Sequence, residues 1–468
     1  MSLTVFPVVR VDSNNGSSSP SASGAGPTTA LTGTNLATSD GLTPSTITLT
    51  SAGDLSGIAT DGSALIYLVT GAGRRFSRIS AVDNTLKTVT IEDTITTANC
   101  TNKSWAIGGT LNALHTSGTW RFLVDNGSSA GDAKAGWIIE LKSGHSETTT
   151  SSDIWPAGDT TTGRFTIRGA AGAATRPLIS TSSANGFYVR GNGNDLNDFD
   201  VKQTTSAAVY VVRLIGDNHN CTGLRVYSTG ATKATNGIYS AGAGRHAVSS
   251  CEIYDCLTGI GTTQSVVALN NYVHDCASYG IDIATTSDAS GNVVVDCGTG
   301  IRFAGTSIPS IHNNVLDTNT VGIEFNSTMI VAPSVTCGVR NNLIVNSTNY
   351  GIHFSNASHT ETYSIYYYYP YFLNNFFYNN GSHHRFNTTN SSDVSLWAGY
   401  SALTDEPFTI ATKAARKTAG DWTVGSACKA TGFPTVNVGL LAATRNYMDV
   451  GLQLQSTSGG STPYVIGS

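Results

Sequence analysis

The feature that most constrains the fold is a short repeat in the middle of the chain. Gly-Ile pairs recur there at intervals of 22, 21, 20, 22 and 29 residues, beginning at Gly237, Gly259, Gly280, Gly300, Gly322 and Gly351. A period in the low twenties is typical of a solenoid, in which each repeat buries its apolar face against the next. The repeat therefore predicts a stack of similar coils, each built from two or three short strands.

A second segment recurs between the Gly-Ile pairs. Its clearest copies are residues 251–256, 271–276, 292–297 and 313–318, and weaker copies are residues 342–347 and 375–380. The central residues are β-branched or aromatic and suit a core stacked in register along the axis: Ile253, Val273, Val294, Val315, Ile344 and Phe377. The Leu-x-x-Leu-x-Leu frame of leucine-rich repeats, which share this period, is missing.

Polar residues repeat in step with this segment. Asn271, Asn292 and Asn313 suit left-handed turn positions, where each side chain can hydrogen-bond to its equivalent in the next coil. The Asp275, Asp296 and Asp317 series is interpreted as turn residues, because every coil would otherwise have to be catalytic. These repeats therefore predict architecture rather than chemistry.

Composition supports a chain of strands and turns. Gly is abundant, at 50 residues, and only 12% of residues are charged, while 40% are hydrophobic, which is enough for a sizeable core. A net charge of −5 without a basic block argues against nucleic acid as the main ligand. Neither a secretory signal nor a membrane span is expected, since no long apolar run occurs.

Cysteine usage indicates neither metal nor disulfides in the repeat. Cys251, Cys256, Cys276 and Cys297 fall inside the repeat and are predicted to be reduced, small buried hydrophobes. Zinc-type CxxC spacing is absent. No metal and no cofactor are therefore expected.

The chain is predicted to have four parts. Residues 1–35, rich in Ser, Gly and Pro, form an N-terminal arm or linker, and residues 36–115 form a small antiparallel β domain for attachment. In that domain, alternating patterns at residues 64–70, 75–82 and 87–92 predict strands. Residues 116–395 form the solenoid, and residues 396–468 form a C-terminal β-rich segment.

The repeat, together with residues 135–147, 164–169 and 176–179, resembles the opening coil and rungs of the pectin-lyase-like family over about residues 120–390. This resemblance implies an all-β, right-handed parallel β-helix. The fold hosts lyases, hydrolases, epimerases and adhesins, so the resemblance alone implies no activity.

The two ends of the chain resemble phage-encoded β-helix virion proteins. The similar segments are residues 11–34, Asp405-Glu-Pro-Phe408, Gly420-Asp-Trp422, Gly432-Phe-Pro434 and residues 447–453. The resemblance implies a protein on the virion surface, a trimeric tailspike or tail fibre that contacts host-surface polysaccharide. Its N-terminal region would bind other virion proteins of the tail or capsid. Two alternatives stay open, a capsid decoration (cement) protein that stabilises the head and a polysaccharide depolymerase, hydrolase or lyase.

Candidate catalytic residues lie beside the Gly-Ile pairs, where alternation points Asp282, Arg302 and Glu324 outward. Asp282 and Glu324 are expected two coils apart, about 10 Å at ~4.8 Å per coil. That is just beyond the separation used by inverting glycosidases, and an alternating-charge ladder is the competing interpretation. The Asp-Asp dipeptide and Gly-His-Gly motif that the polygalacturonase branch of the family would carry are absent, which favours a binding or structural role over an enzyme and leaves a polysaccharide hydrolase or lyase as the enzymatic alternative.

Two further groups of side chains are candidates for binding. An aromatic run lies where the coil lengthens and is expected to contact glycan or a neighbouring subunit: Tyr363, Tyr366, Tyr367, Tyr368, Tyr369 and Tyr371. An outward apolar stripe favours a parallel homotrimer that would cover it: Val293, Val295, Leu316, Leu343 and Val345.

Overall fold

The computed structural model describes residues 8–11, 31–33, 36–96, 105–107, 136–149, 166–326, 338–355, 372–386, 453–455 and 463–465, with short gaps inside the longer ranges. All regular elements in these ranges are β-strands, so the all-β prediction is confirmed. None of the described residues forms a helix long and apolar enough to cross a membrane. The chain divides into two compact units, residues 1–232 and 233–468.

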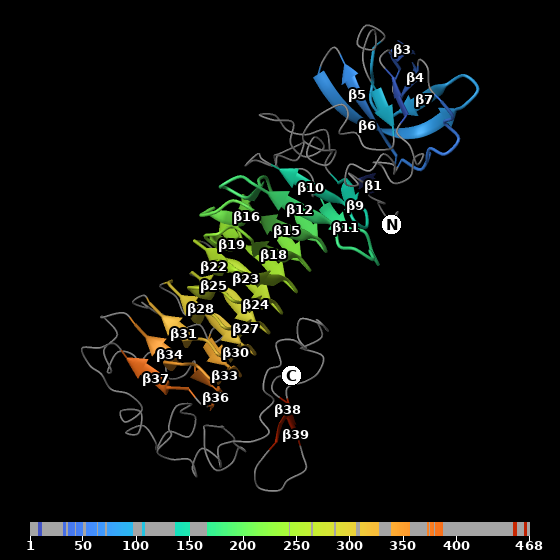
Figure 1. The fold of residues 1–468 in the computed structure, drawn as a ribbon. Coiled ribbons are helices and arrows are strands. Elements are labelled where there is room, and N and C mark those ends of the chain that lie inside the picture. Colours follow the sequence, from blue (N-terminus) through green and yellow to red (C-terminus); the bar gives the residue numbers. More distant parts are fainter. Residues whose placement is uncertain are drawn as a thin grey trace. The chain divides into compact units, whose positions relative to one another are not determined.

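The first unit contains the predicted antiparallel sheet (Figure 1). Its strands follow the order β2-β8-β5-β6-β7-β4-β3. Their bounds are β2 Leu31–Gly33, β3 Leu36–Ser39, β4 Ser45–Leu49, β5 Leu65–Thr70, β6 Gly73–Asp83, β7 Thr88–Ile91 and β8 Trp105–Ile107. Alternate residues of β4 and β7 are buried, as the sequence pattern predicts for strands with one face on a core.

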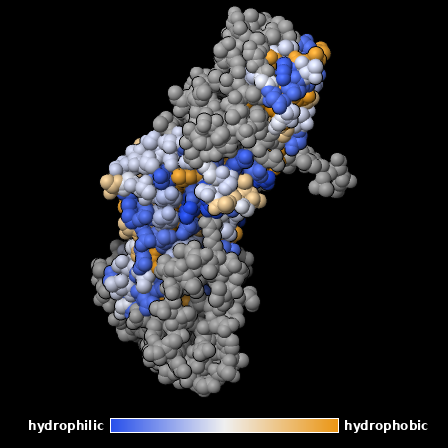
Figure 2. All heavy atoms as spheres, turned by 45° about the vertical axis from the view of Figure 1, so that its right-hand side comes forward, coloured by the Kyte–Doolittle hydropathy of each residue, from blue (hydrophilic) through white to orange (hydrophobic). Residues whose placement is uncertain are grey.

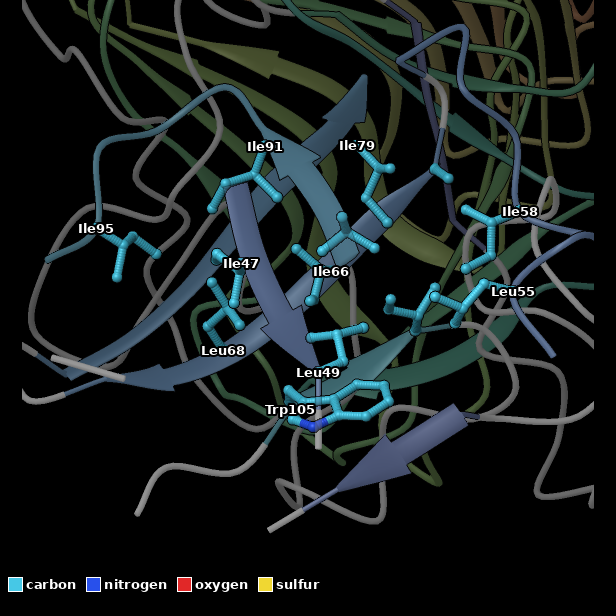
Figure 3. Packing of buried hydrophobic residues seen from close by; sticks show 13 residues of the cluster. Ile47, Leu49, Leu55, Ile58, Ile66, Leu68, Ile79, Ile91, Ile95 and Trp105 are labelled. Carbon is cyan, nitrogen blue, oxygen red and sulfur yellow. The ribbon is translucent and has the colours of Figure 1, made fainter. Parts of the chain in front are cut away.

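The core of this sheet is aliphatic. Ile47, Ile66, Ile79 and Ile91 are fully buried in one cluster, in which Leu49 lies next to Trp105 (Figure 3). Each such side chain contributes about 2–3 kcal/mol relative to an exposed one. The sheet therefore has its own hydrophobic core.

The first unit also contains parallel β-helix strands. They form the rows β1-β9-β11-β14-β17, β10-β12-β15-β18 and β13-β16. The bounds are β1 Val8–Val11, β9 Ile138–Leu141, β10 Ser146–Thr149, β11 Thr166–Gly169, β12 Leu178–Thr181, β13 Phe187–Val189, β14 Asp195–Asn197, β15 Asp200–Gln203, β16 Tyr210–Ile215, β17 Asn220–Thr222 and β18 Arg225–Ser228. Strand β1 lies inside the predicted arm, but its Val-Val-Arg-Val sequence pairs in parallel with β9.

The second unit contains the repeat and forms three parallel rows (Figure 1). The row that begins at the Gly-Ile pairs comprises β19 Ala234–Ala241, β22 Cys256–Thr262, β25 Tyr279–Ile283, β28 Thr299–Phe303, β31 Val321–Phe325, β34 Tyr350–Phe354 and β37 Ser382–Phe386. The second-segment row comprises β21 Glu252–Tyr254, β24 Tyr272–His274, β27 Val293–Val295, β30 Val315–Asp317, β33 Leu343–Val345 and β36 Phe376–Tyr378. The third row comprises β20 His246–Ser249, β23 Val266–Leu269, β26 Asp288–Ser290, β29 Ser310–His312, β32 Gly338–Arg340 and β35 Phe372–Leu373.

The isoleucines of the Gly-Ile pairs form one continuous internal row. Register places them directly above one another, and all are fully buried: Ile238, Ile260, Ile281, Ile301, Ile323 and Ile352. Their glycines are required by close approach. A Cβ on Gly280 would lie 2.3 Å from Val294 Cγ1 and 2.7 Å from the backbone oxygen of Gly300. The repeat signal therefore reports tight internal packing at one corner of each coil.

The second-segment row confirms the predicted stack and corrects one coil. Val273 pairs with Val294, and Val294 pairs with Leu316, which pairs with Ile344. Leu316 therefore occupies the internal position assigned to Val315, and Leu316 is not an outward residue. The reason is the doubled asparagine at 313–314, which shifts this copy by one residue.

The same shift corrects the asparagine series. Asn292 Nδ2 donates to Asn314 Oδ1 at 3.0 Å, and Asn292 Oδ1 accepts from the backbone N of Asn271 at 3.0 Å. Asn313 is not in this buried ladder, because it takes the left-handed turn position with φ 58°. The ladder continues through Asn342 and Asn375. The predicted coil-to-coil amide bonds are therefore confirmed, but the left-handed residue precedes the ladder asparagine.

The aspartate series is largely as predicted. Asp275 and Asp296 have φ of 54° and 52° and are turn residues, as is Asp255 with φ 55°. Asp317 is not, because the shifted register places it in β30 and gives the turn position to Thr318. Cys251, Cys256, Cys276 and Cys297 are free and buried, as predicted.

The predicted domain boundaries at residues 115–116 and 395–396 lie outside the described residues and stay predictions. The predicted boundary at residues 35–36 falls between β2 and β3 and also stays a prediction. In the C-terminal segment, the described residues are the strands β38 Gln453–Gln455 and β39 Pro463–Val465, which pair antiparallel. The predicted aromatic run from Tyr363 to Tyr371 also lies outside the described residues.

Candidate functional site

The outer side of the row β19 to β34 presents a line of polar side chains, which we call the charged face. Strand register aligns one position per coil, and all but Gly261 carry a polar side chain: Tyr239, Gly261, Asp282, Arg302, Glu324 and His353. The outward direction predicted for Asp282, Arg302 and Glu324 is confirmed. The buried neighbours in each strand are the internal isoleucines and phenylalanines, which fix the outward direction of the polar residues. The fold therefore brings the three candidate catalytic residues onto one face.

Asp282 and Arg302 form a two-point ion pair on the charged face. Arg302 Nε donates to Asp282 Oδ1 at 2.8 Å, and a terminal nitrogen of Arg302 donates to Asp282 Oδ2 at 2.5 Å. The Arg302 side chain is 21% exposed and the Asp282 side chain is 17% exposed. The guanidinium also lies 3.8 Å from the ring centroid of Tyr279. A planar contact with two parallel hydrogen bonds holds an arginine in one orientation.

Glu324 stands one coil beyond Arg302. Its Oε2 accepts a hydrogen bond from Thr299 Oγ1 at 3.3 Å. Because it is the register partner of Arg302, it completes an alternating series of negative, positive and negative charges. Asp282 and Glu324 are thus separated by two coils, about 10 Å at the usual strand spacing.

The electrostatics of the pair reflect its partial burial. Burial raises the pKa of Asp282, the bond to Arg302 opposes this, and the charge of Glu324 adds to the increase. Burial lowers the pKa of Arg302, but the hydrogen bond to Asp282 and the charges around the guanidinium together outweigh burial, so this pKa is raised as well. Arg302 N–H groups occupy both carboxylate oxygens of Asp282. The arrangement is therefore that of a charge ladder in which Asp282 keeps a proton more readily than an exposed aspartate does.

A second cluster, which sequence reasoning missed, lies on the outer side of β21 and β24. The ring of His274 stacks on Tyr254 with centroids 4.9 Å apart and on Tyr272 with centroids 4.4 Å apart. His274 Nδ1 lies 2.7 Å from Asp275 Oδ2, and Nε2 lies 3.8 Å from Glu252 Oε1. The alternation of the second segment could have predicted this cluster, because it turns Tyr254 outward in the copy at residues 251–256 and His274 outward in the copy at residues 271–276.

A groove of about 400 Å³ follows the turn beside this cluster. Its lining includes the turn residues Asp255, Asp275 and Asp296, together with Lys233. Lys233 Nζ lies 3.2 Å from Asp255 Oδ1 and donates to the backbone oxygen of Asp275 at 2.8 Å. In the part of the chain that the structure describes, no group of three or more His, Cys, Asp or Glu side chains could hold a metal ion.

The predicted trimer stripe is not exposed in the single chain. Val293, Val295, Leu343 and Val345 are each 3% exposed or less. Leu316 faces the interior, as the register above shows. The trimer thus stays a prediction without an exposed apolar stripe to support it. In the view of Figure 2, the described coils carry mostly hydrophilic and neutral colours with scattered hydrophobic spots.

A match to a protein family supports the same fold. Residues 176–377 match the family described as "Right handed beta helix region". No curated protein matches the chain. The solved structure of Dettilon tailspike protein (gp208) is similar at 15% identity over 54% of this chain, with a TM-score of 0.30, and this chain spans 56% of that protein's length.

Two other similar structures are carbohydrate-active proteins. The catalytic unit of thermostable GH87 alpha-1,3-glucanase from Streptomyces thermodiastaticus strain HF3-3 is 10% identical over 69% of this chain and 81% of its own, with a TM-score of 0.29. The periplasmic alginate epimerase AlgG is 12% identical over 54% of this chain and 74% of its own, with a TM-score of 0.25. The family match and the parallel rows of strands together identify the fold over these residues as a right-handed parallel β-helix.

Proposed function

We propose that this protein binds polysaccharide along the charged face, as the host-recognition part of a phage tailspike or tail fibre. The observation that carries the proposal is the arrangement of Tyr279, Arg302 and Asp282, an aromatic ring and a fixed ion pair on one outward face. Aromatic rings pack well against sugars, since they offer apolar area with little side-chain entropy to lose. Charged groups held in one orientation hydrogen-bond hydroxyls without further ordering.

The repeating geometry supports a polymer as the ligand. Outward residues recur once per coil from Tyr239 to His353, about 4.8 Å apart. At the far end of this series, the rings of Tyr350 and His353 lie 4.6 Å apart and offer a second aromatic surface. A linear polysaccharide also presents repeated groups along a line, so several coils can contact one chain at once.

The particle assignment rests on the resemblance of both chain ends to phage-encoded virion proteins. In this proposal the protein lies on the virion surface as a homotrimer, and its N-terminal region binds other virion proteins. Copy number per particle tests the location. A tailspike is expected in tens of copies or fewer, and a count in the hundreds would instead identify a capsid decoration protein.

Binding is tested by affinity electrophoresis of the full chain in gels with and without purified host-surface polysaccharide. Wild-type protein is expected to be retarded by the polysaccharide. Tyr279→Ala and Tyr350→Ala are each expected to raise the dissociation constant obtained from the retardation about tenfold, since each removes one stacking surface. The matched control is Tyr272→Ala, a partly buried tyrosine of the β21–β24 row. Absence of retardation, or equal losses in all three variants, would contradict the proposal.

A polysaccharide hydrolase or lyase is a second candidate, which the raised pKa of Asp282 favours. A general acid needs such a carboxyl, and Glu324 stands two coils away as a base. Release of reducing ends or unsaturated products from host polysaccharide, lost in Asp282→Asn and Glu324→Gln, would establish this activity. Intact polysaccharide after prolonged incubation would leave binding as the function.

A further inference from the structure

A tyrosine–arginine stack lies on the outer side of β13 and β16 in the first unit. Tyr188 and Arg213 are register partners on these strands. The Arg213 guanidinium carbon lies 4.8 Å from the Tyr188 ring centroid and 4.9 Å from that of Tyr210. Arg190 lies 4.6 Å from the same Tyr188 ring. Two aromatic rings therefore hold the Arg213 guanidinium in place.

Arg213 has no carboxylate partner among the described residues, unlike Arg168, Arg176 and Arg225 of the same unit. Arg168 pairs with Glu140 at 2.7 Å, and Arg176 pairs with Asp200 at 2.6 Å. Arg225 also pairs with Asp200. Arg213 Nε is buried and makes no hydrogen bond within the described part of the chain. A half-buried guanidinium without an anion is costly, and cation–π contacts offset only part of this cost.

We propose that this stack is a subsite for a monoanionic substituent of a sugar, a carboxylate or a sulfate ester, in the bound polysaccharide. The inference rests on the proposed polysaccharide binding. The planar guanidinium can donate two parallel N–H bonds to such a group, a geometry that ammonium cannot reproduce. Tyr210, which is partly exposed, offers apolar surface to the adjoining sugar ring.

The test compares the full chain on matched pairs of polymers by isothermal titration calorimetry. The carboxylate arm uses polygalacturonate and its carboxyl-reduced derivative. The sulfate arm uses a sulfated galactan and its desulfated form. Wild-type protein is expected to bind the acidic member of one pair about tenfold more tightly than the neutral member, and the preference is expected to weaken at high salt.

Variants assign the preference to Arg213. Arg213→Gln is expected to reduce the ratio of acidic to neutral affinity to about one, and Arg213→Lys is expected to retain part of it because it keeps the charge and loses the fork. The control Lys202→Gln, on the neighbouring strand β15 of another row, should retain the full ratio. Circular dichroism spectra identical to wild type show that each variant has folded.

The outcomes separate this inference from the proposed function. Wild-type binding of both members of every pair with equal affinity overturns the anion subsite and leaves polysaccharide binding in place. A preference that survives in Arg213→Gln also overturns the subsite. Binding of neither these polymers nor purified host polysaccharide overturns both proposals.

Discussion

Arg302 donates from Nε to Oδ1 of Asp282 at 2.8 Å, across one coil boundary of the charged face. Glu324 is the register partner of Arg302 on the opposite side, so a single cation stands between two carboxylates. The two acids are therefore spaced by the same residue that neutralises them. This relationship accounts for all three candidate catalytic residues as an alternating-charge ladder, whether or not a ligand also uses them.

Removing the cation should destabilise the coil. Arg302→Met keeps most of the side-chain volume but leaves Asp282 partly buried without its donors, and we expect a loss of about 2 kcal/mol at pH 7. The loss should shrink as pH falls, because loss of Arg302 raises the pKa of Asp282 further and the carboxyl can protonate. In the Arg302→Met variant, the free energy of unfolding is least reduced below about pH 4, where Asp282 is protonated. The reduction grows as pH rises through the folded-state pKa of Asp282, because the buried carboxyl then becomes charged. Urea denaturation from pH 4 to pH 8 measures this.

Two controls accompany that measurement. The double variant Asp282→Asn with Arg302→Met should recover most of the loss and remove its pH dependence. Arg168→Met breaks a similar pair with Glu140, but Arg168 is 39% exposed, so we expect about 0.5 kcal/mol. A pH-independent loss in Arg302→Met would show that packing, rather than the ion pair, is responsible.

The asparagine ladder should be far more sensitive than the turn beside it. Asn314 Oδ1 accepts from the backbone N and Nδ2 of Asn292, and its Nδ2 donates to Ala289 O and Asn342 Oδ1. Asn314→Ala would leave these buried partners unsatisfied, and we expect a loss of about 4 kcal/mol in urea denaturation. The adjacent Asn313→Gly should be neutral or slightly stabilising, since glycine accepts φ 58° without strain. A larger loss in Asn313→Gly than in Asn314→Ala would indicate that Asn313, rather than Asn314, is the ladder residue.

The difference between these two asparagines shows what the sequence could establish. The repeat period, the outward line from Tyr239 to His353 and the internal isoleucines follow from alternation, which is a local property that the structure confirms. Register between coils is not local. The spacing from Asn313 to Asp317 equals that from Asn292 to Asp296, so the sequence alone could not reveal that Asn314 takes the ladder position.

Pairing within the site was also beyond the sequence. Alternation turns Tyr188 and Arg213 outward, but their contact depends on β13 and β16 being neighbouring strands. The two residues are 25 positions apart, in a part of the sequence that does not resemble the regular repeat. The burial of Val293 and Val295 likewise could not be read from their outward positions. Alternation gives the direction of a side chain and leaves open what lies against it.

The glycine row predicts a steric requirement. Gly280→Ala would place a Cβ 2.3 Å from Val294 Cγ1 and 2.7 Å from Gly300 O, so the coil must shift, and we expect a loss of about 3 kcal/mol. Gly144→Ala is the control: its φ is +76° but no atom lies within 4 Å of the added Cβ, which limits the expected loss to about 1 kcal/mol. Thermal unfolding midpoints compare the two. A loss at Gly280 no larger than that at Gly144 would mean that the coil relaxes around the added Cβ and would contradict the steric requirement.

His274 should make stability depend on pH near neutrality. Burial lowers the pKa of His274, but the nearby carboxylates of Glu252, 3.8 Å from Nε2, and Asp275, 2.7 Å from Nδ1, outweigh burial, and the pKa is raised overall. A raised folded-state pKa means that the stabilising contribution is complete below about pH 6.5 and is lost as pH rises through the folded-state value. Wild-type protein should therefore lose more stability between about pH 6 and 8 than His274→Gln does. NMR titration of the His274 ring should give a midpoint above 6.5, which Glu252→Gln lowers, and an identical pH slope in wild type and His274→Gln would refute the assignment.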